Sequence, residues 1–188
     1  PSLVGSEMCI RDRVTAHVPH ITLVSHLGAD MAEAGRPGIS SIDATGMRVG
    51  IVAAQWNAEL CNQMLSRACA VAEEAGATVD VSRVAGSIEL PVIAQQFART
   101  HDAVVAIGVV IRGDTAHFDY VCQSVTDGLT RVALDESTPV GNAVLTVNTV
   151  EQAHARAGYA DSVEDKGGEA TYAALEVACE LKRLRRMD

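Results

Sequence analysis

Aromatic residues are scarce in this sequence. Its 188 residues include two Phe, three Tyr and one Trp, whereas hydrophobic residues, mainly Val, Ile, Leu and Ala, make up 48%. This composition argues against disorder over most of the length and is typical of α/β layers packed from small and branched side chains. The length is enough for one ordinary domain and short for two.

The sequence also lacks a basic stripe. Fifteen Lys and Arg against 24 Asp and Glu give a net charge of -9, whereas a nucleic-acid binder needs a positive contact surface. One basic cluster, at 182–186, closes the last predicted helix, where it complements the helix dipole. Nucleic acid is therefore not expected as a partner, but a phosphorylated small molecule is compatible with a locally positive site.

No cysteine pair has the spacing of a metal or disulfide motif. The five cysteines are scattered, without a C-x-x-C pair or a histidine at ligand spacing, which predicts reduced thiols and no metal site. The longest apolar run, 103–111, is too short to span a bilayer, and no signal-peptide pattern opens the sequence. We therefore expect a cytoplasmic protein without a membrane partner.

The first 45 residues carry little pattern. Residues 7–12 back-translate onto the end of a transposon adapter used in DNA sequencing, which indicates that 1–13 are an artefact of sequence assembly. The alternative is a disordered extension, and finding the same codons on resequencing the gene would exclude the artefact. Residues 14–45 have the weak periodicity of a flexible arm, which leaves 46–188 as the domain. Three histidines in the arm are too irregularly spaced to bind metal: His17, His20 and His26.

From residue 46 onward, apolar runs alternate with helical stripes. The predicted strands cover 49–52, 78–84, 103–111 and 140–147, and the predicted helices cover 58–75, a segment opening near Pro91, 115–133, 149–158 and 168–186. The third strand is apolar on both faces, as in the centre of a parallel sheet. Alternating strands and helices imply right-handed crossovers. We therefore expect a three-layer α/β/α sandwich around a four-stranded parallel sheet of flavodoxin-like strand order.

Unusual residues follow all four predicted strands. They are Trp56-Asn57, Gly86 to Glu89, Arg112 to His117, and Asn148-Thr149. In an open parallel sheet, ligands bind beyond the carboxyl ends of the strands. The convergence of these segments predicts a ligand site at that edge.

The third strand exit predicts a phosphate site. Thr115 is a favoured N-cap, so a helix that begins there presents N–H groups and a positive dipole end to an anion. Gly113 lets the backbone approach that anion. His117, in the first helical turn, is then placed for proton transfer.

Each of these side chains also has a plainer interpretation. Taken alone, His117 is more often an uninvolved surface histidine than a catalytic one. Arg112 can pair with an acid across a subunit contact, which leaves Arg156 to grip a phosphate through a bidentate fork. Trp56 suits stacking on a planar heterocycle, and packing against a neighbouring subunit is the alternative.

Two long blocks carry a resemblance to a known family. Residues 86–91 read G-S-I-E-L-P and residues 108–120 read G-V-V-I-R-G-D-T-A-H-F-D-Y, with shorter blocks at 128–129, 139–140, 151–158 and 165–167. At these residues, and over about 46–185, the chain resembles the lumazine synthase family. The second block is too long and too ordered for a chance match.

The resemblance implies a role for each residue of the site. His117 would transfer protons, Trp56 would stack on a pyrimidine ring, and Asn142 would close over that ring from an adjoining subunit. Arg156 and Lys166 would bind a phosphate. The other implied contacts are Ser87, Ile88 and Glu89 to a ribityl chain, Val109, Val110 and Ile111 to the uracil edge, Asn57 to the same substrate, and Asp114 and Thr115 in the phosphate turn.

The implied reaction belongs to riboflavin biosynthesis. It condenses 5-amino-6-(D-ribitylamino)uracil with 3,4-dihydroxy-2-butanone 4-phosphate to 6,7-dimethyl-8-ribityllumazine, without metal or cofactor. Orientation of the two reactants would supply much of the rate, and His117 would add proton transfer. The alternatives are a non-catalytic flavin-binding or scaffold member of the family, a flavodoxin-like receiver domain, for which the first strand exit lacks acids, and the archaeal type of riboflavin synthase, which the second block fits less well.

Three features depart from the family pattern. Asp114 puts a negative side chain into the phosphate turn, which is tolerable if the contact uses backbone N–H groups. Asn142 stands where many members carry an aromatic residue. The stretch Tyr159–Asp165 is two residues longer than in members that form sixty-subunit capsids, so we expect a homopentamer with active sites between adjacent subunits.

Overall fold

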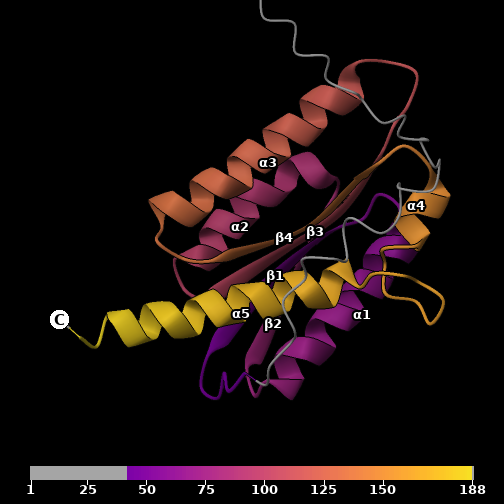
Figure 1. The fold of residues 1–188 in the computed structure, drawn as a ribbon. Coiled ribbons are helices and arrows are strands. Elements are labelled where there is room, and N and C mark those ends of the chain that lie inside the picture. Colours follow the sequence, from indigo (N-terminus) through magenta and orange to yellow (C-terminus); the bar gives the residue numbers. More distant parts are fainter. Residues whose placement is uncertain (1–41, 188) are drawn as a thin grey trace, which may run out of the picture. The chain divides into compact units, whose positions relative to one another are not determined.

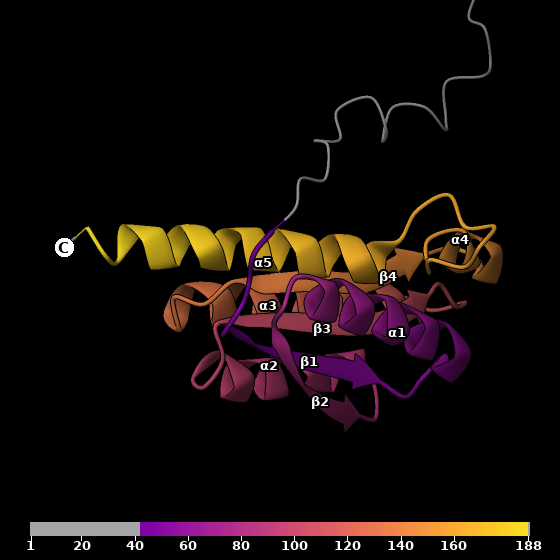
Figure 2. The same cartoon turned by 90° about the horizontal axis from the view of Figure 1, so that it is seen from below.

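A four-stranded, fully parallel sheet forms the centre of the fold. The computed structural model describes residues 42–187, with β1 at Arg48–Ala54, β2 at Thr78–Val84, β3 at Ala103–Ile111 and β4 at Val140–Val147. The strand order is β2-β1-β3-β4, which Figure 2 shows from bottom to top. This is the flavodoxin-like order, so the predicted fold class is confirmed.

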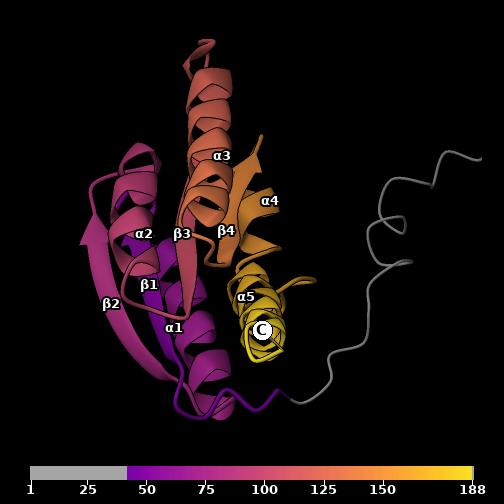
Figure 3. The same ribbon diagram turned by 90° about the vertical axis from the view of Figure 1, so that its left-hand side faces the viewer.

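Helices cover both faces of the sheet (Figure 1). Their bounds are α1 Ala58–Glu74, α2 Leu90–Ala98, α3 His117–Asp135, α4 Val150–His154 and α5 Lys166–Leu184, with a short 3-10 helix, η1, at Ser87–Glu89. The helices α1 and α5 pack on one face, and α2 and α3 pack on the other (Figure 3). The three predicted layers are therefore present.

Two cores result from the alternation of side chains along the central strands. Ile51, Val105 and Ile107 belong to the core under α1 and α5, whereas Val52 and Val104 belong to the core under α2 and α3. Successive side chains of a strand point to opposite faces. Both faces of β1 and β3 are buried, which explains why these strands are continuous apolar runs.

Two glycines let α5 lie unusually close to its neighbours. A Cβ atom at Gly141 of β4 would collide with the Ala170 carbonyl of α5, and one at Gly167 of α5 would collide with the Met64 carbonyl of α1. Hydrogen is the only side chain that fits at these contacts. The spacing of the α1–α5 layer therefore depends on these two positions.

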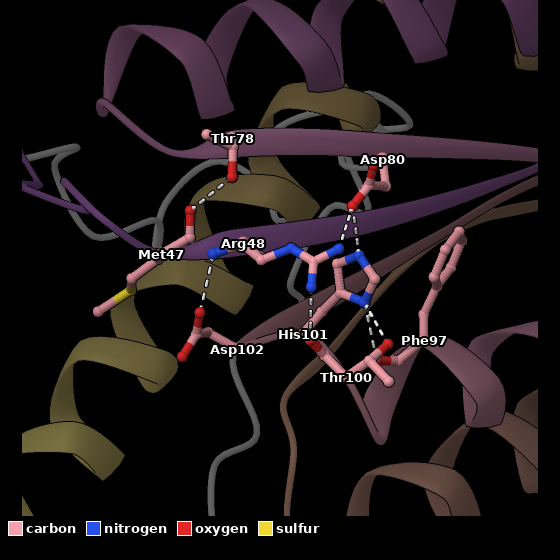
Figure 4. Close-up of polar contacts among 8 residues, drawn as sticks. All are labelled: Met47, Arg48, Thr78, Asp80, Phe97, Thr100, His101 and Asp102. Atoms are coloured by element: carbon pink, nitrogen blue, oxygen red, sulfur yellow. Dashed lines mark hydrogen bonds and ion pairs between the residues drawn. The ribbon is translucent and has the colours of Figure 1, made fainter.

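A polar cluster closes the amino ends of the strands, opposite the strand exits (Figure 4). Asp80 Oδ2 lies 2.6 Å from Arg48 Nη2 and 2.9 Å from Nε2 of His101, whose side chain is only 4% exposed. The Arg48 N–H donates to Asp102 at 2.8 Å. Hydrogen bonds from Arg48 and then His101 hold the pKa of the Asp80 carboxyl below its ordinary value. This cluster joins β1, β2 and the start of β3.

Several element boundaries differ from the predicted ones. The strands at 78–84, 103–111 and 140–147 match, whereas the short helix predicted to end near residue 158 ends at His154. Thr149, where that helix was predicted to begin, is its N-cap, since its side chain accepts from the Gln152 N–H.

The predicted segment 1–13, nearly all of the predicted arm 14–45, and its three histidines lie outside the described residues. Within the described end of the arm, Ala44 is buried and its N–H donates to the Ala75 carbonyl at 2.8 Å. The division of the first 45 residues stays a prediction.

Candidate active site

A cleft of about 540 Å³ lies at the carboxyl ends of β1, β2 and β3. Its walls come from the exit of β1, the segment after β2, the last residues of β3, and the turn that leads into α3. The lining residues are Trp56, Asn57, 86–89, 109–111, Gly113, Thr115, His117, Phe118 and Val121. The structure therefore brings together three of the four predicted strand exits.

The exit of β1 is fixed by the amide of one residue. Asn57 has the left-handed angles φ 55 and ψ 48, and its Nδ2 donates to the Val109 carbonyl at 3.0 Å. The buried Cys61 thiol donates to the Trp56 carbonyl at 3.2 Å, and burial raises the pKa of this thiol to about 11. Trp56 itself is 73% exposed, so its ring is accessible to a planar ligand at the rim of the cleft.

The segment after β2 turns sharply into α2. Glu89 Oε2 accepts from the Gly86 N–H at 2.8 Å, and Pro91 occupies the first turn of α2, where its missing N–H costs nothing. Ser87 is buried, and a Cβ at Gly108 would collide with its hydroxyl. The chain forms the 3-10 helix η1 here and presents Ile88 and Glu89 to the cleft.

The turn after β3 differs from its prediction at the helix start. Thr115 was expected as the N-cap, but α3 begins at His117, and its N-cap is Ala116. Ala116 already has helical angles, and its carbonyl accepts from the Asp119 N–H at 3.1 Å, so the first helical hydrogen bond forms one residue later than expected. Thr115 Oγ1 accepts only a long bond, 3.4 Å, from the His117 N–H. Thr115 and His117 still line the cleft.

Arg112 stands beside the cleft without lining it. Its guanidinium pairs with Asp119 of its own chain at 2.8 Å, so its acidic partner does not have to come from another subunit. That hydrogen bond raises the pKa of Arg112.

Four predicted site residues do not line the cleft. Asn142 lies within the edge strand β4, where its Oδ1 accepts from the Val144 N–H. Arg156 Nε lies 3.9 Å and Lys166 Nζ 2.6 Å from carboxylate oxygens of Glu164. Asp114, the fourth, is exposed in the turn. Because neither Arg156 nor Lys166 reaches the cleft, its described lining contains no basic side chain except the imidazole of His117.

Sequence reasoning missed two lining residues. Phe118 and Val121 belong to the apolar stripe of the helix predicted at 115–133, but both are only half-buried and line the cleft. Val121 also packs against the core under α2 and α3, and the fully buried residues of α3 begin at Val125. The missed signal is the position of both residues in the first turns of the helix, next to the strand exit.

Residues 42–187 contain no group of three His, Cys, Asp or Glu side chains placed to hold a metal ion. No helix in that range is both long and apolar enough to cross a membrane.

A parallel sheet of this strand order, with a cleft at its carboxyl edge, defines an α/β protein that binds small molecules at the strand ends. The family model described as 6,7-dimethyl-8-ribityllumazine synthase matches residues 46–182, and the chain belongs to that family. Relatives named 6,7-dimethyl-8-ribityllumazine synthase include proteins of Salinispora arenicola (61% identity; 83% of this chain and 94% of that protein), Saccharopolyspora erythraea (62%; 82% and 94%) and Corynebacterium efficiens (59%; 82% and 98%).

Proposed function

We propose that this protein condenses 5-amino-6-(D-ribitylamino)uracil with 3,4-dihydroxy-2-butanone 4-phosphate to 6,7-dimethyl-8-ribityllumazine, with release of phosphate and water. Membership of the family supports the reaction. The observation that carries the assignment to this cleft is the joint presence of an exposed indole, the turn 86–89, the end of β3 and an imidazole. Family resemblance alone does not require these groups to meet within one chain.

The pyrimidine substrate is assigned to the part of the cleft between β1 and β3. Trp56 offers a flat ring for stacking, and the backbone of 109–111 offers hydrogen-bonding groups to the uracil edge. Asn57 uses one of its two amide N–H donors on Val109, so it would contact substrate through Oδ1 or the remaining N–H. Ser87, Ile88 and Glu89 would hold the ribityl chain, with Glu89 Oε1 as acceptor, since Oε2 is bonded to Gly86.

The chemistry needs proton transfers more than it needs a strong acid or base. The substrate amine attacks the ketone and loses water to form an imine, phosphate then leaves, and the second amine closes the ring with loss of another water. His117 lies beside the turn 113–116, where it can move protons at the carbonyl and at the leaving phosphate. Holding both reactants together supplies the larger part of the rate.

A second copy of the chain is proposed to complete the phosphate site. The backbone N–H groups of the turn holding Asp114 and Thr115 suit an anion, but Arg156, Lys166 and Asn142 do not line the cleft of their own chain. A neighbour related by rotation could bring these three residues to the open side of the cleft. Such a head-to-tail contact closes into a ring.

The proposed ring is a homopentamer of about 99 kDa, five times the 19.8 kDa chain, located in the cytoplasm. The stretch Tyr159–Asp165 contacts the residues before it through a bridge between Asp165 and Ala157 and through the stacking of Tyr159 on His154. We assign this longer stretch to the prevention of larger shells. Sedimentation of a megadalton particle would refute that assignment.

The direct test of function is lumazine fluorescence after the purified protein is mixed with the two substrates. Wild type should be active, and His117→Ala should be slowed by no more than about 100-fold, because proton transfer is the smaller contribution. A folded, pentameric wild type that makes no lumazine would instead support the non-catalytic scaffold function.

Subunit mixing tests whether sites are shared. His117→Ala alters the cleft, whereas Arg156→Ala alters the part assigned to the neighbour. In randomly mixed rings made from equal amounts of both, about a quarter of the sites should be intact if each combines the cleft of one chain with the arginine of the next. No gain over the average of the two separate variants would show that each chain builds its site alone.

A further inference from the structure

Arg112, the residue directly after β3, contacts three other residues with one guanidinium. Nη2 and Nη1 lie 2.8 and 3.4 Å from the two carboxylate oxygens of Asp119, which is a bidentate arrangement. Nε donates to Asn148 Oδ1 at 3.0 Å, and the guanidinium carbon lies 4.1 Å from the centre of the Phe118 ring. We call these four residues the Arg112 clasp.

The clasp spans the turn that carries the proposed anion site. Its arginine also donates its backbone N–H to the Val147 carbonyl at 2.9 Å, so it is anchored on the last residue of β4. Asp119 and Phe118 belong to the first turn of α3. The clasp therefore joins the ends of β3 and β4 to the start of α3. Both ends of the segment 113–117 are held in this way.

The enclosed turn has little support of its own. Residues 112–117 are exposed, a Cβ at Gly113 would meet nothing within 4 Å, and the one side-chain hydrogen bond inside the turn is the 3.4 Å bond to Thr115. An exposed turn with few contacts samples several conformations unless its ends are held. Within the described residues, the clasp is the side-chain structure that holds them.

We infer that Arg112 is a positioning residue, which acts through Asp119 to hold the turn 113–116 and His117 at the cleft, and that it does not bind the substrate phosphate itself. This inference rests on the proposed function. Arg112 does not line the cleft, and three of its five N–H donors are engaged, one on each nitrogen. To grip a phosphate through two parallel hydrogen bonds, the guanidinium would have to leave Asp119 or Asn148.

The experiment compares Arg112→Gln, Asp119→Asn and the double variant. Each should raise the KM for the butanone phosphate about tenfold and lower kcat, because small misplacements of reacting groups are costly. The KM for the ribitylaminouracil should change less than about twofold, since that substrate is assigned to other segments. The double variant should be no worse than either single one, because residues that act as a unit are not additive.

The variant Asp119→Asn separates positioning from direct binding by the sign of its effect. Without its carboxylate partner, a phosphate-binding Arg112 would gain free positive charge, and the KM for the butanone phosphate would fall. A positioning Arg112 loses its hold on the helix, and the KM rises. Asp119→Glu, which keeps the carboxylate, should recover part of the loss, which a general loss of stability would not predict.

A matched control lies at the other end of α3. Arg131 and Asp135 form an ion pair of the same 2.8 Å length on the same helix. Arg131→Gln should leave both KM values within about twofold of wild type, because this i,i+4 pair lies within one helix and holds no other segment. Equal effects of Arg131→Gln and Arg112→Gln would overturn the inference.

Failure of the inference can be told apart from failure of the proposed function. A wild type that makes no lumazine refutes the function, and the clasp is then tested with inorganic phosphate by calorimetric titration. Weaker phosphate binding by Asp119→Asn, with faster amide exchange over 113–117, supports the clasp. Unchanged or tighter binding refutes it. If Arg112→Gln does not fold, Asp119→Asn carries the same comparison.

Discussion

Asn57 combines two stabilising features that substitution can separate. Its backbone is left-handed at φ 55, and its amide donates to the Val109 carbonyl at 3.0 Å. Asn57→Gly keeps the backbone conformation at little cost but loses the hydrogen bond, which contributes about 1 kcal/mol. Asn57→Ala loses the same bond and keeps a Cβ in the left-handed region, which costs about 1–2 kcal/mol relative to glycine. Glycine gives part of that advantage back through its more flexible unfolded chain. Alanine should therefore destabilise by about 1 kcal/mol more than glycine.

The assay is urea unfolding without substrate, at one protein concentration, because assembly changes apparent stability by mass action. A difference of 1 kcal/mol between the alanine and glycine variants corresponds to a midpoint shift of about 0.5 M urea. Ser137, the other described non-glycine residue with positive φ (50), calibrates the backbone contribution. Ser137→Ala and Ser137→Gly should differ by the same amount in the same direction.

Equal stability of Asn57→Gly and Asn57→Ala would refute the reasoning about backbone strain. If Asn57→Ala were as stable as wild type, the bond to Val109 would contribute nothing, because both residues carry a Cβ at the same backbone angles.

Three further outcomes follow from the packing and charges. Gly167→Ala should lower the free energy of unfolding by about 1–3 kcal/mol, because the new methyl group collides with the α1 backbone, whereas Gly113→Ala, which meets nothing within 4 Å, should change it by less than about 0.5 kcal/mol in the same urea assay. Alkylation at pH 8 followed by mass mapping should label buried Cys61, with its pKa near 11, later than half-buried Cys69; equal rates would contradict this. The folded pKa of Asp80 is depressed, so its contribution to stability is present above the unfolded pKa and is lost as the pH falls below about 4. Asp80→Asn should reduce the loss of unfolding free energy on acidification. An unchanged dependence on acid pH would show that the ion pairs of Asp80 do not couple stability to pH.

Three of the four strands were the most predictable part of the fold. The runs at 78–84, 103–111 and 140–147 matched to the residue. The physical reason is clearest for β3, since a central strand buried between helix layers is a continuous apolar run. The other central strand, β1, was predicted at 49–52 and extends over Arg48–Ala54. Helix starts were less predictable. Thr115 has the chemistry of an N-cap, but Ala116 already has helical angles, and the small free energy of a cap does not override the geometry of a loop held at both ends.

The site was predictable only where it depends on strand direction. Parallel strands place their carboxyl ends at one edge, so the grouping of Trp56, the turn after β2 and His117 could be expected from chain order. The partner of Arg112 could not be predicted, because many carboxylates can pair with a guanidinium and the sequence does not say which one lies close to it. The separation of Arg156 from the cleft was equally hidden, because it depends on where β4 and its loop lie in space.

By itself, the sequence determined the α/β class, the strands and the family, because apolar periodicity and a long ordered motif are local properties of the chain. Tertiary structure alone decided which exits meet, that Phe118 and Val121 line a cleft, and that Arg112 pairs with Asp119 of its own chain. Those outcomes depend on distances between segments far apart in the sequence, and such distances are set by packing across the whole domain rather than by any one segment.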